Sequence, residues 1–314
     1  APEGLGRYPK GFDPMNVPVD NPLTEEKIDL GKRLFYDPIL SIDSTISCAS
    51  CHFPEKAFTD GRPVSIGVEG RTHFRNSPTL ANVGYGGRMF MDGGVTNLEI
   101  QAMVPIIEHI EMGNSVSNVL EVLNAHPEYP ALFDRVFGEG PSPFTITRAL
   151  ASFQRSLISG DSRFDQYYYQ EKTEALSPSE IRGMELFFSD ELQCRSCHSG
   201  FLFTNYEYVN NGIYIDYGQD TGRMRITLKE EDRGAFKVPT LRNIEVTGPY
   251  MHDGSFSTLE EIVEHYMQGG KGHPNQDPRI SGFSLSAQEK QDLINFLKSL
   301  TDQAFLMNPD HRYP

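Results

Sequence analysis

The sequence of 314 residues contains no tryptophan, and its basic residues are few, with 28 Lys and Arg against 43 Asp and Glu. The formal net charge is −15 at pH 7. No basic cluster is present that could hold a phosphate backbone, which removes the usual basis for nucleic-acid binding. We therefore expect no nucleic-acid partner, and we expect any protein partner to present a basic face.

Long hydrophobic runs are also absent. Hydrophobic residues make up 38% of the chain, and no run approaches the roughly 20 apolar residues that a membrane span requires. No membrane span is expected. The length suffices for about two domains that each bury a core, and we expect them at residues 1–160 and 161–314.

Cysteine is scarce as well, because all four cysteines belong to two CxxCH pentapeptides and none remains for a disulfide. CxxCH is the signature of covalent c-type haem attachment, in which both thiols add to vinyl groups and the adjacent histidine ligates the iron. The alternative, a single Cys₄ zinc site, leaves the histidine after each pair unexplained. The sequence thus predicts two c-type haems held by Cys48, Cys51, His52, Cys194, Cys197 and His198.

The haem signature also indicates a compartment. Covalent attachment of c-type haem takes place outside the cytoplasm, yet the sequence starts at Ala1 without a basic n-region or an apolar h-region. We therefore expect a secreted, periplasmic protein from which a signal peptide has been removed.

Amphipathic periodicity with cap signals predicts a helical protein. Regular strands are scarce, and residues 199–221 and 269–278 have the composition of surface loops. The predicted fold class is all-α. The clearest helices are expected at 25–36 after Thr24, at 145–158, at 178–188 after Ser177, and from Ser286 onward.

The chain repeats itself, since residues 78–99 align without a gap on residues 239–260, at an offset of 161. Each segment follows its own CxxCH, and each CxxCH follows a similar helix, LGKRLFYD in the first half and RGMELFFSD in the second. A solenoid would need a shorter period and more copies. We therefore predict two cytochrome c-like domains, each binding one covalent c-type haem, related by internal duplication.

The repeat exposes an asymmetry, because the same offset places Tyr266 opposite Pro105. Proline cannot ligate iron, so His52 would face an open position, whereas His198 and Tyr266 would hold the second haem. A slip of one residue would make Met267 the ligand instead. An open ferric haem can bind hydrogen peroxide, which makes the first haem the candidate reaction site.

Two polar residues flank Pro105 in the sequence: Gln101 precedes it by four residues and Glu111 follows it by six. Cleavage of an O–O bond requires that a proton move from the inner to the outer oxygen, which suits a buried carboxyl with a raised pKa. The alternative for Glu111 is a solvated carboxylate in a turn. Among the remaining histidines, His73 is a candidate to affect the first haem, and surface positions are expected for most of His109, His126, His265, His273 and His311.

A set of longer motifs accompanies both CxxCH pentapeptides: FRNSPTLANV from Phe74, an MDGG turn followed by LEIQA, the IEMG segment, and VPTLRNIEVTGPYMHDGSFSTLEEIVEHY from Val238. Through these motifs the chain resembles the bacterial di-haem cytochrome c peroxidase and MauG superfamily along nearly its whole length. The resemblance implies that Gln101, Pro105 and Glu111 form the peroxide pocket of the first haem.

Two departures from the peroxidase members point the same way. Val68 stands where peroxidases often hold a second, displaceable histidine on the first haem, so the resemblance implies a haem that is open without prior reduction. Tyr266 stands where they have an axial methionine and where MauG-like members have a tyrosine. A phenolate stabilises Fe(III) and higher oxidation states, so the second haem is expected to have a low potential.

The resemblance further implies a calcium ion between the haems. Its protein ligands map onto Asn76, Thr247 and Pro249, the last two through backbone oxygens, as suits a hard cation. The family usually places a tryptophan between the haems, but the matching residue here is Met91. Electron sharing would then use a direct path, another residue such as Phe90, or bridging groups.

Taken together, these features imply a peroxide-dependent oxidoreductase. Hydrogen peroxide would react at the first haem, and a two-electron-oxidised, bis-Fe(IV)-like state shared between the irons would oxidise a protein or another external donor. The alternatives are a di-haem cytochrome c peroxidase, which takes electrons from a small cytochrome or copper protein, and a pure electron carrier. The open position disfavours the carrier, and a low-potential Tyr266 haem disfavours the peroxidase unless Met267 is the ligand.

Overall fold

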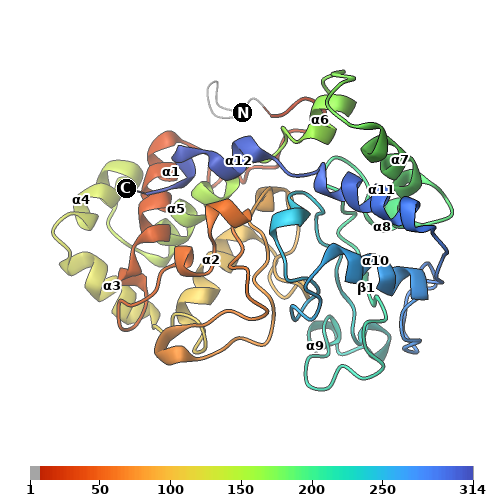
Figure 1. Ribbon diagram of the computed structural model, residues 1–314. Coiled ribbons are helices and arrows are strands. Elements are labelled where there is room, and N and C mark those ends of the chain that lie inside the picture. Colours follow the sequence, from red (N-terminus) through yellow and green to blue (C-terminus); the bar gives the residue numbers. More distant parts are fainter. Residues whose placement is uncertain (1–7, 314) are drawn as a thin grey trace.

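The computed structural model describes residues 8–313. Over these residues the chain forms twelve α-helices and one short antiparallel sheet (Figure 1). The prediction of a helical fold with few strands is confirmed. Within the described part of the chain, no helix is long and apolar enough to cross a membrane. The elements are α1 Glu25–Tyr36, α2 Leu98–Ile107, α3 Val116–Ala125, α4 Tyr129–Phe137, α5 Pro143–Ser156, α6 Arg163–Tyr168, α7 Pro178–Phe188, α8 Cys194–Cys197, β1 Tyr208–Val209, α9 Met224–Thr227, β2 Phe236–Lys237, α10 Leu259–Gln268, α11 Ala287–Lys298 and α12 Gln303–Met307.

Local signals set the starts of the predicted helices. The Thr24 side chain accepts a hydrogen bond from the Lys27 N–H at the start of α1. Ser177 and Glu180 form the expected capping box at the start of α7, and Ser286 opens α11 in the same way. Each cap satisfies N–H groups that have no partner inside the helix.

The helix predicted at 145–158 begins and ends two residues earlier than expected. Ser142 caps α5 and Pro143 occupies its first helical position, where the missing N–H of proline costs nothing. The sequence signal for this start was therefore present in Ser142 and Pro143. The loop expected at 199–221 contains β1, a strand of two residues.

Two helix pairs form the framework: α1 packs across α5, and α7 packs across α11 (Figure 1). Each crossing has a glycine at its closest point. A Cβ atom added to Gly31 would lie 1.9 Å from the carbonyl oxygen of Ala149, and one added to Gly183 would lie 1.9 Å from that of Asp292. The absence of a side chain is what lets the helix backbones approach this closely.

Replacement of Gly183 by Ala is expected to lower the free energy of unfolding by about 1–3 kcal/mol, because α7 and α11 must separate to admit the methyl group. Denaturant unfolding followed by far-ultraviolet circular dichroism measures the change. Gly87→Ala is the matched control, since nothing lies within 4 Å of a Cβ atom built there. An equal effect of both substitutions would contradict the close crossing.

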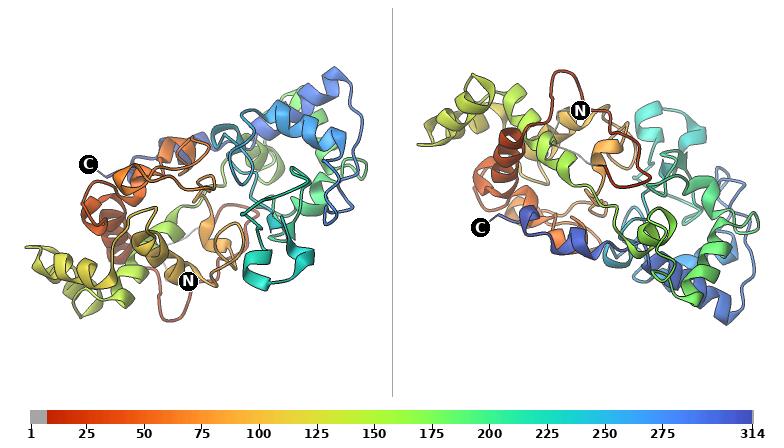
Figure 2. Two further views of the ribbon diagram at one scale, coloured as in Figure 1. Left: turned by 90° about the horizontal axis from the view of Figure 1, so that it is seen from below. Right: turned by 90° about the horizontal axis from the view of Figure 1, so that it is seen from above.

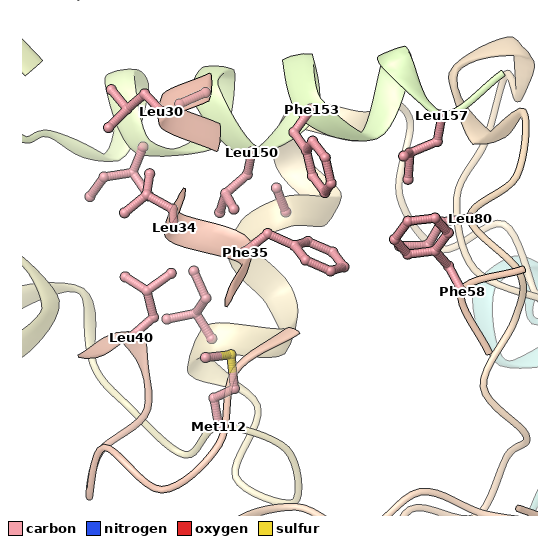
Figure 3. Packing of buried hydrophobic residues seen from close by; sticks show 14 of the residues in the cluster. Leu30, Leu34, Phe35, Leu40, Phe58, Leu80, Met112, Leu150, Phe153 and Leu157 are labelled. Atoms are coloured by element: carbon pink, nitrogen blue, oxygen red, sulfur yellow. The ribbon is translucent and has the colours of Figure 1, made fainter. Parts of the chain in front are cut away.

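Each half has its own hydrophobic core. The first includes Leu34 of α1 and Phe153 of α5, shown in Figure 3, and the second includes Phe187 of α7 and Phe296 of α11. The end of the chain crosses back, since Phe305 of α12 belongs to the first core. Figure 2 shows this crossing from the second half to the first. The C-terminal segment thus fastens the two halves together.

The two halves share hydrogen bonds at matching positions. The Asn82 N–H donates to the carbonyl oxygen of Leu157 at 2.7 Å, and the Asn243 N–H donates to that of Leu300 at 3.0 Å. Both asparagines have positive φ, 61° and 60°. Asn82 and Asn243, which are 161 residues apart, therefore occupy the same structural position in their halves, although their acceptors Leu157 and Leu300 are 143 residues apart.

The contact between the halves is itself reciprocal. The Asn76 N–H donates to the carbonyl oxygen of His252 at 2.8 Å, and the Lys237 N–H donates to that of Met91 at 2.7 Å. Asn76 and Lys237 are 161 residues apart, as are Met91 and His252. The repeated segments thus face each other across an approximate two-fold axis.

Ion pairs centred on two buried side chains, Arg75 and Asp92, reinforce this contact. The Arg75 guanidinium lies 2.8 Å from the Asp92 carboxylate and 2.6 Å from that of Asp220 in the second half, and Arg225 lies 2.5 Å from Asp92. Burial alone would raise the pKa of Asp92, but the hydrogen bonds and charges of both arginines hold it below its usual value. The pairs fix how the two halves are oriented.

Two candidate haem sites

The CxxCH histidines are held in the same way in both halves. His52 Nδ1 lies 2.6 Å from the carbonyl oxygen of Phe58, and His198 Nδ1 lies 2.9 Å from that of Phe203. Because a carbonyl oxygen only accepts, Nδ1 carries the proton and Nε2 is left free. Burial lowers the pKa of both histidines. A neutral imidazole with its second nitrogen fixed in this way is suited to ligate a haem iron.

The four cysteines are free, half-buried thiols. Burial raises the pKa of Cys48 and of Cys194 to about 12, so both are neutral at physiological pH. Cys48 packs against the first core and Cys194 against the second. A shared Cys₄ zinc site would require both pairs at one point, so the separation of the pairs contradicts that alternative. Two thiols beside a free imidazole nitrogen fit one c-type haem in each half.

The first site is bounded by α2, which Asn97 caps. Pro105 lies inside this helix, and its carbonyl oxygen accepts the Met112 N–H at 3.1 Å, so the following turn folds back against it. Gln101 lies one turn earlier in α2. Its buried Oε1 has no hydrogen-bond partner among the described residues. Buried polar atoms are normally hydrogen-bonded, so this oxygen is available to a bound ligand.

Glu111 lies in the turn after α2. Burial raises the pKa of its carboxyl to about 7, and the nearby charge of Glu108 adds to the rise. The Glu111 charge in turn contributes to the raised pKa values of Cys48 and Cys51, so the carboxyl lies within electrostatic reach of the first CxxCH. The Glu111 side chain is half-buried rather than fully solvated, with 31% of its surface exposed.

Val68 also lies at this site. Its side chain is buried, and its N–H donates to the carbonyl oxygen of Glu111 at 2.8 Å. A Cβ atom on Gly67 would lie 2.1 Å from the carbonyl oxygen of Ile110, so the 67–68 backbone packs tightly on the Glu111 turn. An aliphatic side chain at position 68 offers no atom that could ligate iron.

The second site is bounded by α10. This helix and α2 begin 161 residues apart and each has ten residues, so Tyr266 and Pro105 occupy the same place within their helices. Burial raises the pKa of Tyr266 to about 12, Asn211 lowers it by a hydrogen bond, and Cys197 and Cys194 raise it through their charges. The phenol thus lies within electrostatic reach of the second CxxCH. Met267 instead packs against the second core.

The residues matched to a calcium site come from both halves. The Asn76 side-chain amide donates to the carbonyl oxygen of Arg62 at 2.7 Å, and its backbone N–H donates to His252. Thr247 and Pro249 lie in the segment that leads to His252. The structure thus brings Asn76 to the segment that contains the other two. Met91, joined to β2 by its carbonyl oxygen, lies at the same contact between the halves.

Three histidines expected mostly at the surface are buried: His265, His273 and His311. His311 packs against Phe58 and Phe305 at the end of the chain. His265 and His273 are buried because the loops 199–221 and 269–278 pack on each other. The Lys271 N–H donates to Gly212 at 2.8 Å, and the Asp277 N–H donates to Asn210 at 3.0 Å. Polar composition alone does not reveal such loop pairing.

The sequence reasoning missed the two carbonyl groups that orient the ligating histidines. Phe58 and Phe203 both have positive φ, 63° and 53°, which turns their carbonyl oxygens toward the imidazole rings. The sequence did contain a shared pattern, because a Phe-Thr pair begins six residues after His52 and five residues after His198. It also missed Asp220, whose pairing with Arg75 has no sequence pattern.

Comparison with known proteins gives a consistent result. A family model described as di-haem cytochrome c peroxidase matches residues 25–173. The chain is 38% identical to the methylamine utilization protein MauG of Methylorubrum extorquens over 90% of this chain and 80% of that protein. It is 36% identical to the cytochrome-c peroxidase IdrP1 of Pseudomonas sp. strain SCT over 96% of this chain and 87% of that one.

A solved structure extends the likeness to three dimensions. A MauG-like protein associated with microbial copper homeostasis superposes with a TM-score of 0.92 and 37% identity, covering 98% of both chains. Relatives thus include proteins named MauG and proteins named cytochrome c peroxidase. From the family match and these identities, the chain belongs to the di-haem cytochrome c peroxidase family and is a haem-dependent oxidoreductase that acts with peroxide.

Proposed function

We propose that this enzyme is MauG-like: hydrogen peroxide reacts at the first haem, and the oxidising equivalents, shared with the second haem, oxidise a protein or another external donor. Two bound haems would supply the redox chemistry, namely the two electrons that cleavage of the O–O bond of peroxide requires. The proposed covalent attachments are Cys48 and Cys51 in the first half and Cys194 and Cys197 in the second. Separation of the CxxCH pairs into two cores supports one haem per half.

The observation that carries this proposal is the contrast between Tyr266 and Met267. The half-buried Tyr266 phenol lies within electrostatic reach of Cys194 and Cys197, whereas the half-buried Met267 packs against the second core. With His198 and Tyr266 as its protein ligands, a haem in the second half would have a low potential, so it would store an oxidising equivalent and take electrons poorly from high-potential donors.

At the first haem we propose a division of roles among three residues. Val68 and Pro105 offer no atom that could ligate a haem iron held by His52, so hydrogen peroxide would have access to that iron. Glu111 takes the proton from the peroxide oxygen nearer the iron and returns it to the outer oxygen, which leaves as water. Gln101, whose Oε1 has no partner among the described residues, positions the peroxide by hydrogen bonding.

Further proposals concern the framework. Matching hydrogen bonds in the two halves support internal duplication of a cytochrome c-like domain. Asn76 lies beside the segment that contains Thr247 and Pro249, and this arrangement supports a calcium site between the halves. Met91 lies at the same contact, and we propose that it occupies the gap between the haems.

The net charge of −15 favours a partner with a basic face, and we propose a periplasmic location.

The second candidate function is cytochrome c peroxidase, in which a small electron-transfer protein supplies the electrons that reduce peroxide to water. The 36% identity to a protein of that name favours it. The two functions differ in the potential of the second haem, because a peroxidase requires a haem that readily accepts an electron from its donor.

Electron paramagnetic resonance of the diferric protein tests the proposal. We expect one high-spin five-coordinate haem and one tyrosine-ligated haem, because Val68 and Pro105 cannot ligate the first iron. Mössbauer spectra after mixing with peroxide are expected to show both irons oxidised. Two low-spin signals, each from a haem with a distal protein ligand, would refute the open first haem.

A further inference from the structure

His73 lies beside the first candidate haem site, and its ring is fixed on three sides. The Arg75 backbone N–H donates to Nδ1 at 3.0 Å, and the ring stacks on Phe74 with a centroid separation of 4.8 Å and an interplanar angle of 10°. The remaining nitrogen, Nε2, lies 3.5 Å from Oε1 of Glu111. Two neighbouring residues of its own segment and the separate turn of Glu111 therefore determine the orientation of this imidazole.

The contact at Nδ1 determines where the proton of this ring resides. Because Nδ1 accepts a backbone N–H, the neutral ring carries its proton on Nε2, the nitrogen that faces Glu111. Protonation at Nδ1 would break the hydrogen bond from Arg75, and burial lowers the pKa of His73. His73 is thus a fixed, neutral donor directed at the carboxylate.

The backbone holds the two partners as one unit. Residues 65–73 form a narrow hairpin, in which Ile66 bridges Thr72 and the His73 N–H donates to the carbonyl oxygen of Ser65 at 3.1 Å. At the tip of this hairpin, the Val68 N–H donates to the carbonyl oxygen of Glu111 at 2.8 Å. The hairpin that carries His73 is therefore anchored to the turn that carries Glu111.

The other charges around the pair come from several elements. Glu108, at the end of α2, raises the pKa of Glu111, and the charges of Arg75 and Asp220 act on His73. Arg71 forms an ion pair with Glu69, and its guanidinium also lies 3.1 Å from Nδ1 of His109. Of these groups, only His73 presents a donor to the Glu111 carboxylate. The separation is about 0.5 Å longer than an ordinary N–H···O bond, and such contacts commonly tighten in the reacting complex.

We propose that His73 is a positioning residue that hydrogen-bonds the ionised Glu111 carboxylate, fixes its orientation and keeps it ionised near neutral pH. This inference rests on the proposed function of Glu111 at the first haem. A donor to the charged form of a carboxyl stabilises that form and lowers its pKa. His73 thus opposes the burial that raises the pKa of Glu111, so that the carboxylate is present to accept the peroxide proton.

The test compares two substitutions in the haem-loaded full chain. His73→Phe retains an aromatic ring against Phe74 but has no donor, whereas His73→Gln retains a donor that can reach Glu111. Infrared titration of the Glu111 carboxyl band in the resting protein, assigned with Glu111→Gln, measures its pKa without any turnover. Stopped-flow mixing with peroxide across a pH series measures the midpoint of the reaction.

With His73→Phe, both midpoints are expected to rise by about one pH unit, the size of one hydrogen bond to a charged group. At pH 7 this corresponds to about a fivefold slower reaction. His73→Gln is expected to restore both midpoints close to the parental values. His109→Gln is the control, since His109 is exposed and contacts Arg71, and it should change neither.

Unchanged midpoints in His73→Phe would overturn the inference, and so would equal shifts in the Phe and Gln variants. The infrared measurement separates this inference from the proposed function. If Glu111→Gln reacts with peroxide at the parental rate, the role of Glu111 in the reaction fails, while the infrared shift in His73→Phe still reports whether His73 bonds to the carboxylate.

Discussion

Replacement of Glu111 by Gln is expected to slow the reaction with peroxide by roughly 10²-fold or more, the scale of general acid–base catalysis. The substitution retains the shape of the side chain but removes the group that accepts and returns the proton. Both resting haem spectra are expected to stay nearly unchanged, because Glu111 ligates neither iron in the proposed arrangement. Stopped-flow mixing of the diferric protein with peroxide measures the rate.

The pH dependence provides an internal check on this result. Burial, assisted by Glu108, raises the pKa of Glu111 to about 7. The carboxyl must be ionised to take the peroxide proton, so the parental rate is expected to rise as the pH increases through about 7. This rise should be absent in Glu111→Gln.

Glu108→Gln is the matched control, since it removes a neighbouring carboxylate and leaves Glu111 in place. We expect the reaction to persist, with its midpoint at a lower pH, because the charge of Glu108 contributes to the raised pKa of Glu111. A Glu111→Gln variant that reacts at the parental rate would leave Gln101 or ordered water as the groups that move the proton.

The sequence predicted the helical fold correctly, and several positions 161 residues apart have the same local structure in both halves. The two halves bury similar helices against similar loops, so the 161-residue offset carries through from the Asn82 and Asn243 turns to α2 and α10. The equivalent positions of Pro105 in α2 and Tyr266 in α10 follow from that offset. Helix caps such as Ser177 could also be predicted from the sequence, because a cap residue interacts only with the first turn of its own helix.

Contacts between segments that lie far apart in the chain could not be predicted from the sequence. The pairing of Arg75 with Asp220 joins residues 145 apart, and no local pattern marks either one. The return of α12 to the first core depends on Phe305 finding a hydrophobic surface in the other half. The orientation of His73 toward Glu111 likewise arises from a hairpin whose tip packs on a turn more than 35 residues later in the chain.

The second large effect is expected at Tyr266. Replacement of Tyr266 by Met should raise the potential of the second haem by a few tenths of a volt, within the roughly 0.8 V over which axial ligands set haem potentials. A neutral thioether stabilises the oxidised iron much less than a phenolate does, so the variant should also store an oxidising equivalent less well. Spectroelectrochemical titration of both haems measures the potentials.

Met267→Leu separates the two candidate ligands. Met267 packs against the second core, so Leu should fill its place at a cost below about 1.5 kcal/mol and leave the potential of the second haem unchanged. If Met267 were the ligand, its replacement would change the spectrum and potential of that haem, and Tyr266→Met would change neither. The pair of variants thus decides whether the second haem has the low potential of a MauG-like enzyme or the higher one that a peroxidase needs to accept electrons from its donor.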